Sequence, residues 1–168
     1  MKKIILGCLV MAMSTISLGA KEPLKEVSEI VEIPNMEKKQ IFDASKIWMA
    51  QSFKSSNSVV QYEDQDTGII IGKGNMKYPC KGAWNCLAYE KTLVLFTVKI
   101  DTKDNKARVT FNDLLLKTAT TVNAGIVSHG YEVGIYVPKD KENIENGLKE
   151  VIQKFKSDIQ KNPTSNDW

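Results

Sequence analysis

The side chains best suited to chemistry are one histidine and one pair of cysteines. His129 is the only histidine in the chain, and Cys80 and Cys86 lie in a segment that also holds proline and glycine. A Ser-His-Asp arrangement would have to use His129, but the sequence has no Gly-x-Ser-x-Gly turn to present a serine nucleophile. The Cys-x-x-Cys or His-x-x-x-His spacing of a zinc site is also absent. We therefore expect no catalytic residue and no metal site. A small hydrolase or thiol-redox protein using His129 or Cys80 and Cys86 remains the alternative function.

The two cysteines are better explained as a structural disulfide. Five residues separate Cys80 from Cys86, and such a pair can close a loop in an oxidising compartment. A redox-active pair would have Cys-x-x-Cys spacing and a helix N-terminus following it to stabilise a thiolate, and we expect neither. The spacing therefore predicts a disulfide between Cys80 and Cys86.

Glycine and aspartate positions give little support for a cofactor or a cation. Gly68, Gly72 and Gly74 fall in a predicted hairpin with no helix after them, so no phosphate-binding loop is formed and we expect no cofactor. Asp64 and Asp66, followed by Gly68, resemble part of a calcium loop. The further oxygen ligands and the closing glutamate are missing, so a plain hairpin turn is favoured.

The N-terminus has the pattern of a secretory signal peptide. Lys2 and Lys3 precede an apolar run that starts at Ile4, and the small residues Gly19 and Ala20 close the segment. This order predicts cleavage after Gly19 or Ala20. An uncleaved anchor is disfavoured because the apolar stretch is short for a membrane-spanning helix. We interpret Cys8 as part of the apolar run of the signal peptide, since lipoprotein-type cleavage there would leave a strongly apolar mature N-terminus.

Charge gives no sign of a nucleic-acid partner. The chain has 23 basic and 20 acidic residues with a formal net charge of +3, and loss of Lys2 and Lys3 would bring this to about +1. Arg108 is the only arginine, whereas arginine is the usual bidentate ligand of phosphate and guanine. We therefore expect no nucleic-acid binding.

Hydrophobic spacing predicts two helices. The first runs from Glu37 to about Lys54, with Asn35 as its N-cap. The second runs over residues 141–160, after Pro138 as a breaker and Asp140 as a cap. Their apolar stripes are Ile41, Phe42, Ser45, Trp48, Met49, Ser52 and Phe53 in the first, and Ile144, Leu148, Val151, Ile152, Phe155 and Ile159 in the second.

Alternation predicts an antiparallel sheet between the helices, with one strand before the first helix. The predicted strands cover residues 27–33, 59–63, 69–74, 93–100 and 107–116, with a further short strand within 131–137. Residues 75–85 read as irregular, and residues 117–130 as a long loop or a loose edge strand.

Three stretches resemble a bacterial family of exported proteins of unknown function with a TATA-binding-protein-like (TBP-like) fold. They are Ile30–Pro34 with the helix that holds Lys46–Ala50, then Val59–Gly74, and then the hairpin Leu93–Leu116. The resemblance covers most of Glu29–Leu116 and the final helix. It implies an α+β fold, a curved antiparallel sheet with two helices packed on one face, in β-α-β4-α order. It implies no activity, and fold likeness to a DNA-binding protein does not carry DNA binding with it.

The sheet face opposite the helices is the candidate binding face. If Val94, Phe96, Val98 and Ile100 face the helices, the alternate residues face away. The candidate face is Leu93, Leu95, Thr97 and Lys99 with Arg108, Thr110 and Asn112 of the neighbouring strand. Two alternatives stay open: residues 118–137 could fold across this face, or it could be ordinary solvated surface.

These features together predict an exported protein, periplasmic or secreted. We expect a signal peptide at residues 1–20, a single domain at 21–162 and a polar tail at 163–168. The expected function is that of a non-catalytic envelope module, monomeric and not integral to the membrane after cleavage. Its expected partner is a protein, a peptide or a small ligand.

Overall fold

The computed structural model describes residues 22–53, 60–123 and 125–161. The predicted signal peptide and the polar tail lie outside the described residues. The first described element enters the sheet directly, and the last is the long C-terminal helix, so both predicted helices and all the predicted strands can be compared with the structure.

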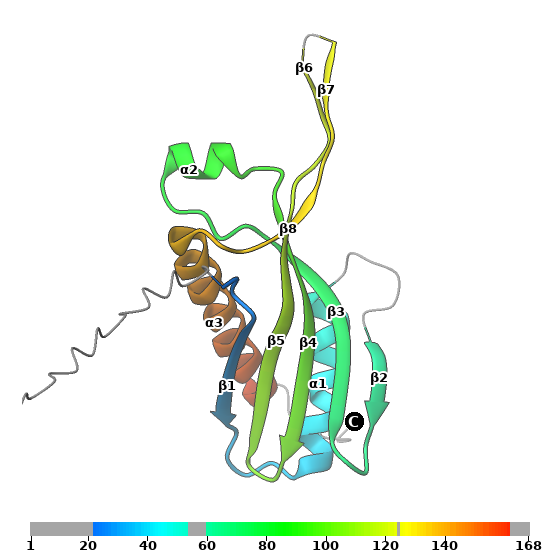
Figure 1. Cartoon of the computed structure of the whole chain (residues 1–168). Coiled ribbons are helices and arrows are strands. Elements are labelled where there is room, and N and C mark those ends of the chain that lie inside the picture. The colour runs from blue at the N-terminus through cyan, green and yellow to red at the C-terminus, as the bar shows by residue number, and fades with distance from the viewer. Residues whose placement is uncertain (1–21, 54–59, 124, 162–168) are drawn as a thin grey trace, which may run out of the picture.

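One antiparallel sheet forms the centre of the molecule (Figure 1). In spatial order its strands are β1 (Glu26–Glu32), β5 (Lys106–Lys117), β4 (Leu93–Lys103), β3 (Ile69–Lys77) and β2 (Val60–Asp64). A short strand, β8 (Glu132–Gly134), also pairs with β5. It lies beyond the end of β1 on the same edge of β5, and the Leu24 N–H donates to the Ile135 carbonyl where the two segments meet.

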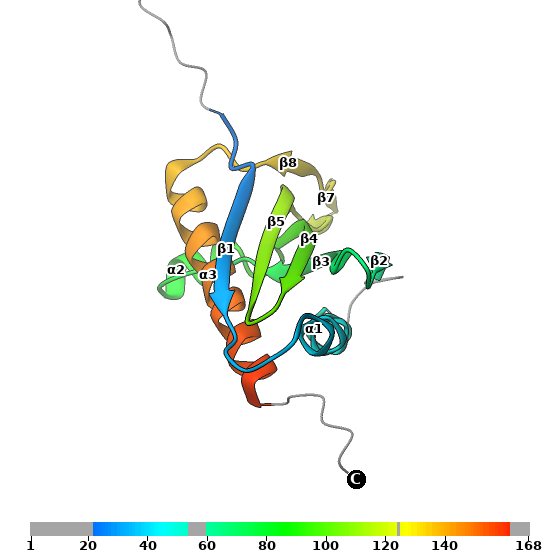
Figure 2. The same cartoon turned by 90° about the horizontal axis from the view of Figure 1, so that it is seen from below.

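Two long helices, α1 (Lys38–Ser52) and α3 (Pro138–Lys161), cover the same face of this sheet (Figures 1 and 2). The predicted α+β architecture, with two helices on one face of an antiparallel sheet, is therefore confirmed. The core lies between the helices and the sheet, and its largest fully buried side chains include Phe111, Phe155, Met49, Ile41 and Leu148. Among the residues that the structure describes, no helix covers the other face of the sheet.

Alternation along β4 matches the prediction. Val94, Phe96, Val98 and Ile100 are buried against the helices, and the intervening side chains point to the open face and are half-buried. Gly74 of β3 makes this packing possible, because a Cβ there would lie 2.8 Å from the ring of Phe96. Trp48, predicted as a core anchor, is buried and meets Phe53 and Phe155 edge-on.

Alternation along β5 breaks at a β-bulge that the sequence pattern does not reveal. Thr97 pairs with Asn112 and Leu95 pairs with Leu115, so two residues of β5 stand opposite one residue of β4. Asp113, one of the two, has a φ of 52°, as expected for a bulge residue in the left-handed region. The inserted residue reverses which side chains face the helices. It also falls where the edge partner of β5 changes from β1 to β8.

Several predicted boundaries were wrong. Glu37 is the N-cap of α1, in a capping box with Gln40, and Asn35 instead occupies a turn with a φ of 63°. Helix α3 begins at Pro138, because proline suits the first turn of a helix, where its missing N–H leaves no bond unmade. Asp140 is a buried first-turn residue of this helix.

The segments predicted as irregular hold further structure. Strand β3 extends to Lys77, and a short helix, α2 (Ala83–Ala88), follows it. A two-stranded hairpin of β6 (Thr121–Asn123) and β7 (Ile126–Ser128) occupies the segment left open as a loop or edge strand. We call residues 118–123 and 125–131 the arm, because they project from the end of the sheet (Figure 1).

Candidate functional site

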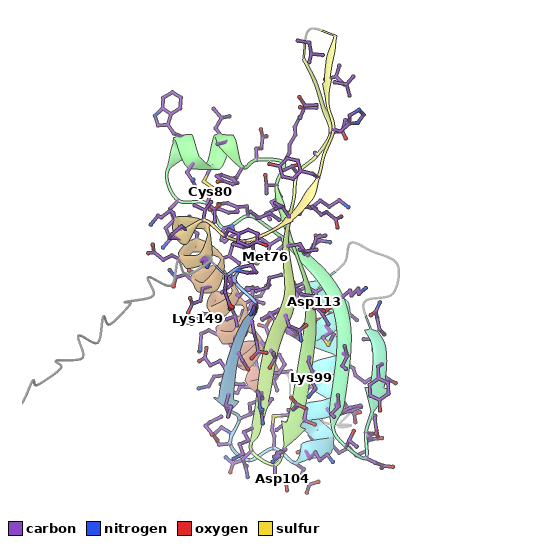
Figure 3. All side chains as sticks on the ribbon, in the orientation of Figure 1. Met76, Cys80, Lys99, Asp104, Asp113 and Lys149 are labelled. Atoms are coloured by element: carbon purple, nitrogen blue, oxygen red, sulfur yellow. A yellow bond between two sulfur atoms is a disulfide. The ribbon has the colours of Figure 1, made fainter. Side chains whose placement is uncertain are left out.

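A groove of about 610 Å³ lies on the open face, at the end of the sheet next to β8. Residues of β3, β4, β5 and β8 line it: Lys73, Gly74, Asn75, Leu93, Leu95, Phe96, Thr97, Asp113, Leu115, Lys117 and Glu132. The arm extends away from the sheet and does not fold across it (Figures 1 and 3). The arm therefore leaves the candidate face uncovered in the described part of the chain, where Glu132 is the one residue of 118–137 that lines the groove.

The floor of the groove is apolar because of the β-bulge. Leu93 and Leu95 face the groove from β4, and Leu115 lies directly beside Leu95 on β5. Without the extra residue at Asp113, strict alternation would turn Leu115 toward the helices. The bulge thus brings a third leucine to the open face and leaves Leu114 buried at 4% exposure.

The rim of the groove is polar and mixed in charge. Lys73 stands on the β3 side, and Asp113 lies at the bulge, between the end of the sheet and Lys99 (Figure 3). Lys117 and Glu132 are joined by an ion pair of 2.9 Å that links β5 to β8. An apolar floor with separated polar groups around it is the usual make-up of a small-ligand or peptide site.

The predicted binding face is divided by the structure. Leu93, Leu95 and Thr97 line the groove. Lys99 lies outside it and pairs with Asp101 at 2.7 Å. Arg108 lines a separate hollow of about 190 Å³ near the opposite end of the strands.

The other two residues of the predicted face are largely taken up by the fold. Thr110 is buried at 8% exposure, and its hydroxyl lies 2.8 Å from that of Ser28 on β1. Asn112 is half-buried, and its buried Oδ1 has no hydrogen-bond partner among the described residues. Neither residue lines the groove.

Sequence reasoning missed the groove residues outside β4. Lys73 and Asn75 could have been found, because they alternate with residues of β3 that face the helices. Asp113, Leu115 and Lys117 could not, since their direction depends on a bulge that no residue pattern marks.

The cysteine pair closes a loop that follows β3. Cys80 and Cys86 form a disulfide with Cα atoms 4.9 Å apart, as the sequence predicted. The expectation that no helix follows was wrong, because α2 begins at Ala83. His129 is exposed on the arm, on an element separate from the disulfide.

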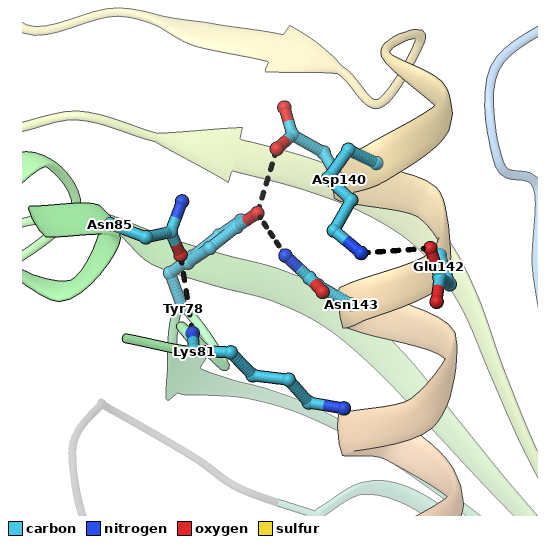
Figure 4. Close-up of polar contacts among 7 residues, drawn as sticks. Tyr78, Lys81, Asn85, Asp140, Glu142 and Asn143 are labelled. Atoms are coloured by element: carbon cyan, nitrogen blue, oxygen red, sulfur yellow. Dashed lines mark hydrogen bonds and ion pairs between the residues drawn. The ribbon is translucent and has the colours of Figure 1, made fainter. Parts of the chain in front are cut away.

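A buried polar cluster joins the same loop to α3 (Figure 4). The Tyr78 hydroxyl donates to Asp140 Oδ1 at 2.7 Å and accepts from Asn143 Nδ2 at 3.1 Å. Tyr89 stacks on Tyr78 with ring centroids 3.9 Å apart and donates to the same carboxylate at 3.2 Å. Burial raises the pKa of Tyr78 to about 12, and the Asp140 carboxylate contributes in the same direction. The pKa of Tyr89 is also raised, first by burial and then by Asp140.

In the turn at Asp64–Gly68, which resembles a calcium loop, the Asp64 carboxylate is hydrogen-bonded to backbone N–H groups of the turn itself. Asp64 Oδ1 accepts from the N–H groups of Asp66 and Thr67 at 2.9 and 3.2 Å, which is an Asx-type turn. These contacts hold the pKa of Asp64 below its ordinary value, with the Thr67 bonds as the main cause. Across the described ranges, no three His, Cys, Asp or Glu side chains gather closely enough to hold a metal ion.

Comparison with known proteins agrees with the observed architecture. Residues 28–116 match the family DUF4468, described as a domain of unknown function with a TBP-like fold. No curated protein matches the chain. Within the part of the chain that the structure describes, no helix is long and apolar enough to cross a membrane.

Two solved structures share the fold. A DUF4468 family protein from Bacteroides ovatus is 16% identical with a TM-score of 0.57, covering 89% of this chain and 94% of its own. A TBP-like protein from Parabacteroides distasonis is 18% identical with a TM-score of 0.56, covering 80% of this chain and 92% of its own. Identities at this level relate the folds and not the activities.

Proposed function

Since the chain belongs to DUF4468, a family of domains of unknown function with a TBP-like fold, we propose that it is an exported, non-catalytic binding module. Its ligand binds in the groove on the open sheet face. The observation that carries the proposal is the leucine floor of Leu93, Leu95 and Leu115 at the base of a 610 Å³ groove. The ligand is a peptide or small molecule with an apolar centre and polar ends, because polar side chains surround that floor.

The groove's own chemistry supports binding over catalysis. Two of its four titratable side chains, Lys117 and Glu132, pair with each other across the two strands, so neither of these two is set up as a free acid or base. The alternative residues lie elsewhere, with His129 exposed on the arm and the cysteines joined to each other. The disulfide supports export, because such bonds persist in oxidising compartments.

Substitution in the floor of the groove tests the proposal. Leu95→Glu places a charge in the middle of the groove and should abolish ligand binding, while Leu95 is only half-buried and the fold should persist. Ile30→Glu is the matched control, since Ile30 is 57% exposed on β1 and lies outside the groove. The probe is the fluorescent amphipathic dye anilinonaphthalene sulfonate, together with capture of envelope components on immobilised protein.

The expected result is that Leu95→Glu loses dye binding and capture while Ile30→Glu keeps both. Urea unfolding of each variant separates lost binding from lost folding. Equal binding by the two variants would reject the groove as the site. A loss of more than about 3 kcal/mol in Leu95→Glu, of the size seen for core positions, would show Leu95 to be core instead.

A further inference from the structure

The short helix α2 is held firmly although it contributes nothing to the core. It has six residues, none of them buried, and a helix of this length is unstable on its own. The Cys80–Cys86 disulfide ties it to the preceding loop. Its C-cap Tyr89 is fixed by stacking on Tyr78 and by the bond to Asp140. These contacts fix an exposed helix in place, which keeps its outer side chains available for contact with a partner.

The side chains that α2 presents are large and apolar. Trp84 is 86% exposed and Leu87 is 66% exposed, whereas Trp48, in the core, is 4% exposed. Tryptophan combines a large apolar body with one N–H donor, which suits the boundary between water and a nonpolar phase.

The arm presents a second apolar set at the same end of the molecule (Figures 1 and 3). Val122 is 65% exposed, Ile126 71% and Val127 49%. Residues 118–131 contain no Asp, Glu, Lys or Arg, although charged residues make up 26% of the chain. A charge-free hairpin with aliphatic side chains at its tip is unusual on a solvated surface, where exposed hairpins generally carry charge.

We propose that α2 and the arm attach this domain to the surface of an anionic lipid bilayer. Helix α2 and the arm both project from the domain, so together they can contact a flat, deformable surface more readily than they could enter a rigid groove. The segment that carries α2 is basic, because Lys77, Lys81 and Lys91 are exposed and Glu90 is its one acidic residue. Lysines around an exposed tryptophan complement anionic headgroups.

The depth of insertion is limited by the arm's backbone. Among the described strands, β6 and β7 pair with each other and with no other strand, so their outer edges carry N–H and C=O groups outside any strand pairing that cannot enter the hydrocarbon. The tip and Trp84 therefore rest at the level of the headgroups and the first part of the acyl chains, as in other interfacial segments. The domain remains outside the bilayer.

Quenching of tryptophan fluorescence by brominated lipids tests whether Trp84 contacts the bilayer. The chain has three tryptophans, Trp48, Trp84 and Trp168, and Trp168→Phe leaves the buried Trp48 and the exposed Trp84 as reporters. Phosphatidylethanolamine and phosphatidylglycerol vesicles with brominated acyl chains should quench Trp84. The double variant Trp84→Phe with Trp168→Phe should show no quenching. Because both proteins keep the same N-terminus, binding through an apolar leader cannot produce this difference.

A matched pair of isoleucine substitutions tests the arm. Ile126→Asp should lower the vesicle partition coefficient at least about tenfold, since one buried aliphatic side chain contributes more than 1.4 kcal/mol. Ile47→Asp on α1 should leave it unchanged, because Ile47 is 49% exposed and lies away from the arm. Replacing phosphatidylglycerol with phosphatidylcholine should weaken binding. Both isoleucines are exposed, and thermal unfolding checks that each variant is folded.

Absence of Trp84 quenching, or equal partitioning of the two isoleucine variants, would overturn the proposal. Sedimentation velocity tests the alternative that a second copy of the chain occupies this surface. Self-association that Ile126→Asp abolishes, without vesicle binding, would assign α2 and the arm to a second copy of the chain and reject the lipid surface.

Discussion

Tyr78 and Asp140 are joined by a buried 2.7 Å hydrogen bond that connects the end of β3 to the first turn of α3. Tyr78 is 4% exposed and Asp140 is 6% exposed. Tyr78→Phe removes a donor to this carboxylate and the acceptor of the Asn143 amide. We expect a loss of about 1–3 kcal/mol in the free energy of unfolding. Urea titration measures it, with Tyr62→Phe as control because Tyr62 is 51% exposed. Equal stability of the two variants would contradict the role assigned to the cluster.

Alkaline titration should reveal the same tyrosine. The pKa of Tyr78 is raised from 10.0 to about 12 in the folded protein, so between these values the folded state holds a proton that the unfolded state releases. The stabilisation is fully present below pH 10 and is lost as the pH rises through about 12. Absorbance at 295 nm should show late-ionising phenols, and Tyr78→Phe should remove part of that late signal while Tyr89, whose pKa is also raised, still contributes to it. A single wave near pH 10 in both proteins would contradict the raised pKa.

The disulfide should make a modest contribution to stability. The loop closed by Cys80 and Cys86 is short, so the double variant Cys80→Ser with Cys86→Ser should lose about 2 kcal/mol by the chain-closure estimate. The double variant is preferred to a single one because it leaves no unpaired thiol. Thiol titration of denatured protein isolated without reductant gives an independent check, and reactive thiols at both positions would refute the bond.

The bulge at Asp113 should be sensitive to the shape of its side chain. Its φ of 52° is tolerated by aspartate and glycine but costs a β-branched residue more. Asp113→Gly should leave stability unchanged or slightly raised, whereas Asp113→Val should lower it by about 1–3 kcal/mol. Arg108→Val is the control, because Arg108 is exposed in a regular part of the same strand. If both valine variants were equally stable, strain at position 113 would be ruled out.

Removal of the leader remains a prediction from Lys2 to Ala20 alone. Protein purified from its native envelope should lack the first 19 or 20 residues, because small residues close the apolar run there. Intact-mass measurement decides the point. A retained Met1 or a lipid attached to Cys8 would show this interpretation to be wrong.

The sequence predicted the parts of the fold that periodicity controls. The stripe of α3 and the alternation of β4 identified the buried faces, since a residue's direction follows from the repeat alone. Trp48 was correctly placed in the core for the same reason. The same patterns gave the order of the elements, and the family resemblance added the placement of both helices on one face of the sheet, which periodicity does not give.

The parts that were missed depend on single residues or on distant contacts. Nothing in the run Phe111–Leu114 marks an extra residue, yet the bulge decides which leucines reach the groove. Helix α2 is too short for a periodic signal and is held by Cys80 and by residues far away in the chain. Pro138 was taken for a breaker, although proline is equally suited to a first turn. Three of the seven residues of the candidate face therefore line the groove, and the rim residues Asp113, Lys117 and Glu132 were not among the predicted ones.

Gln153 of α3 donates a 2.7 Å hydrogen bond to Glu29 of β1, across a separation of 124 residues. The helix that covers the first strand is thus synthesised after every strand of the sheet. A chain that emerges N-terminus first cannot close its core until Phe155 and Ile159, both buried, have followed. High sequence separation between contacting segments also slows folding. Until α3 has been synthesised, the part of the sheet that it covers stays exposed. For the same reason, a fragment ending with the family-matched span at residue 116 would lack one wall of its core and would not fold alone.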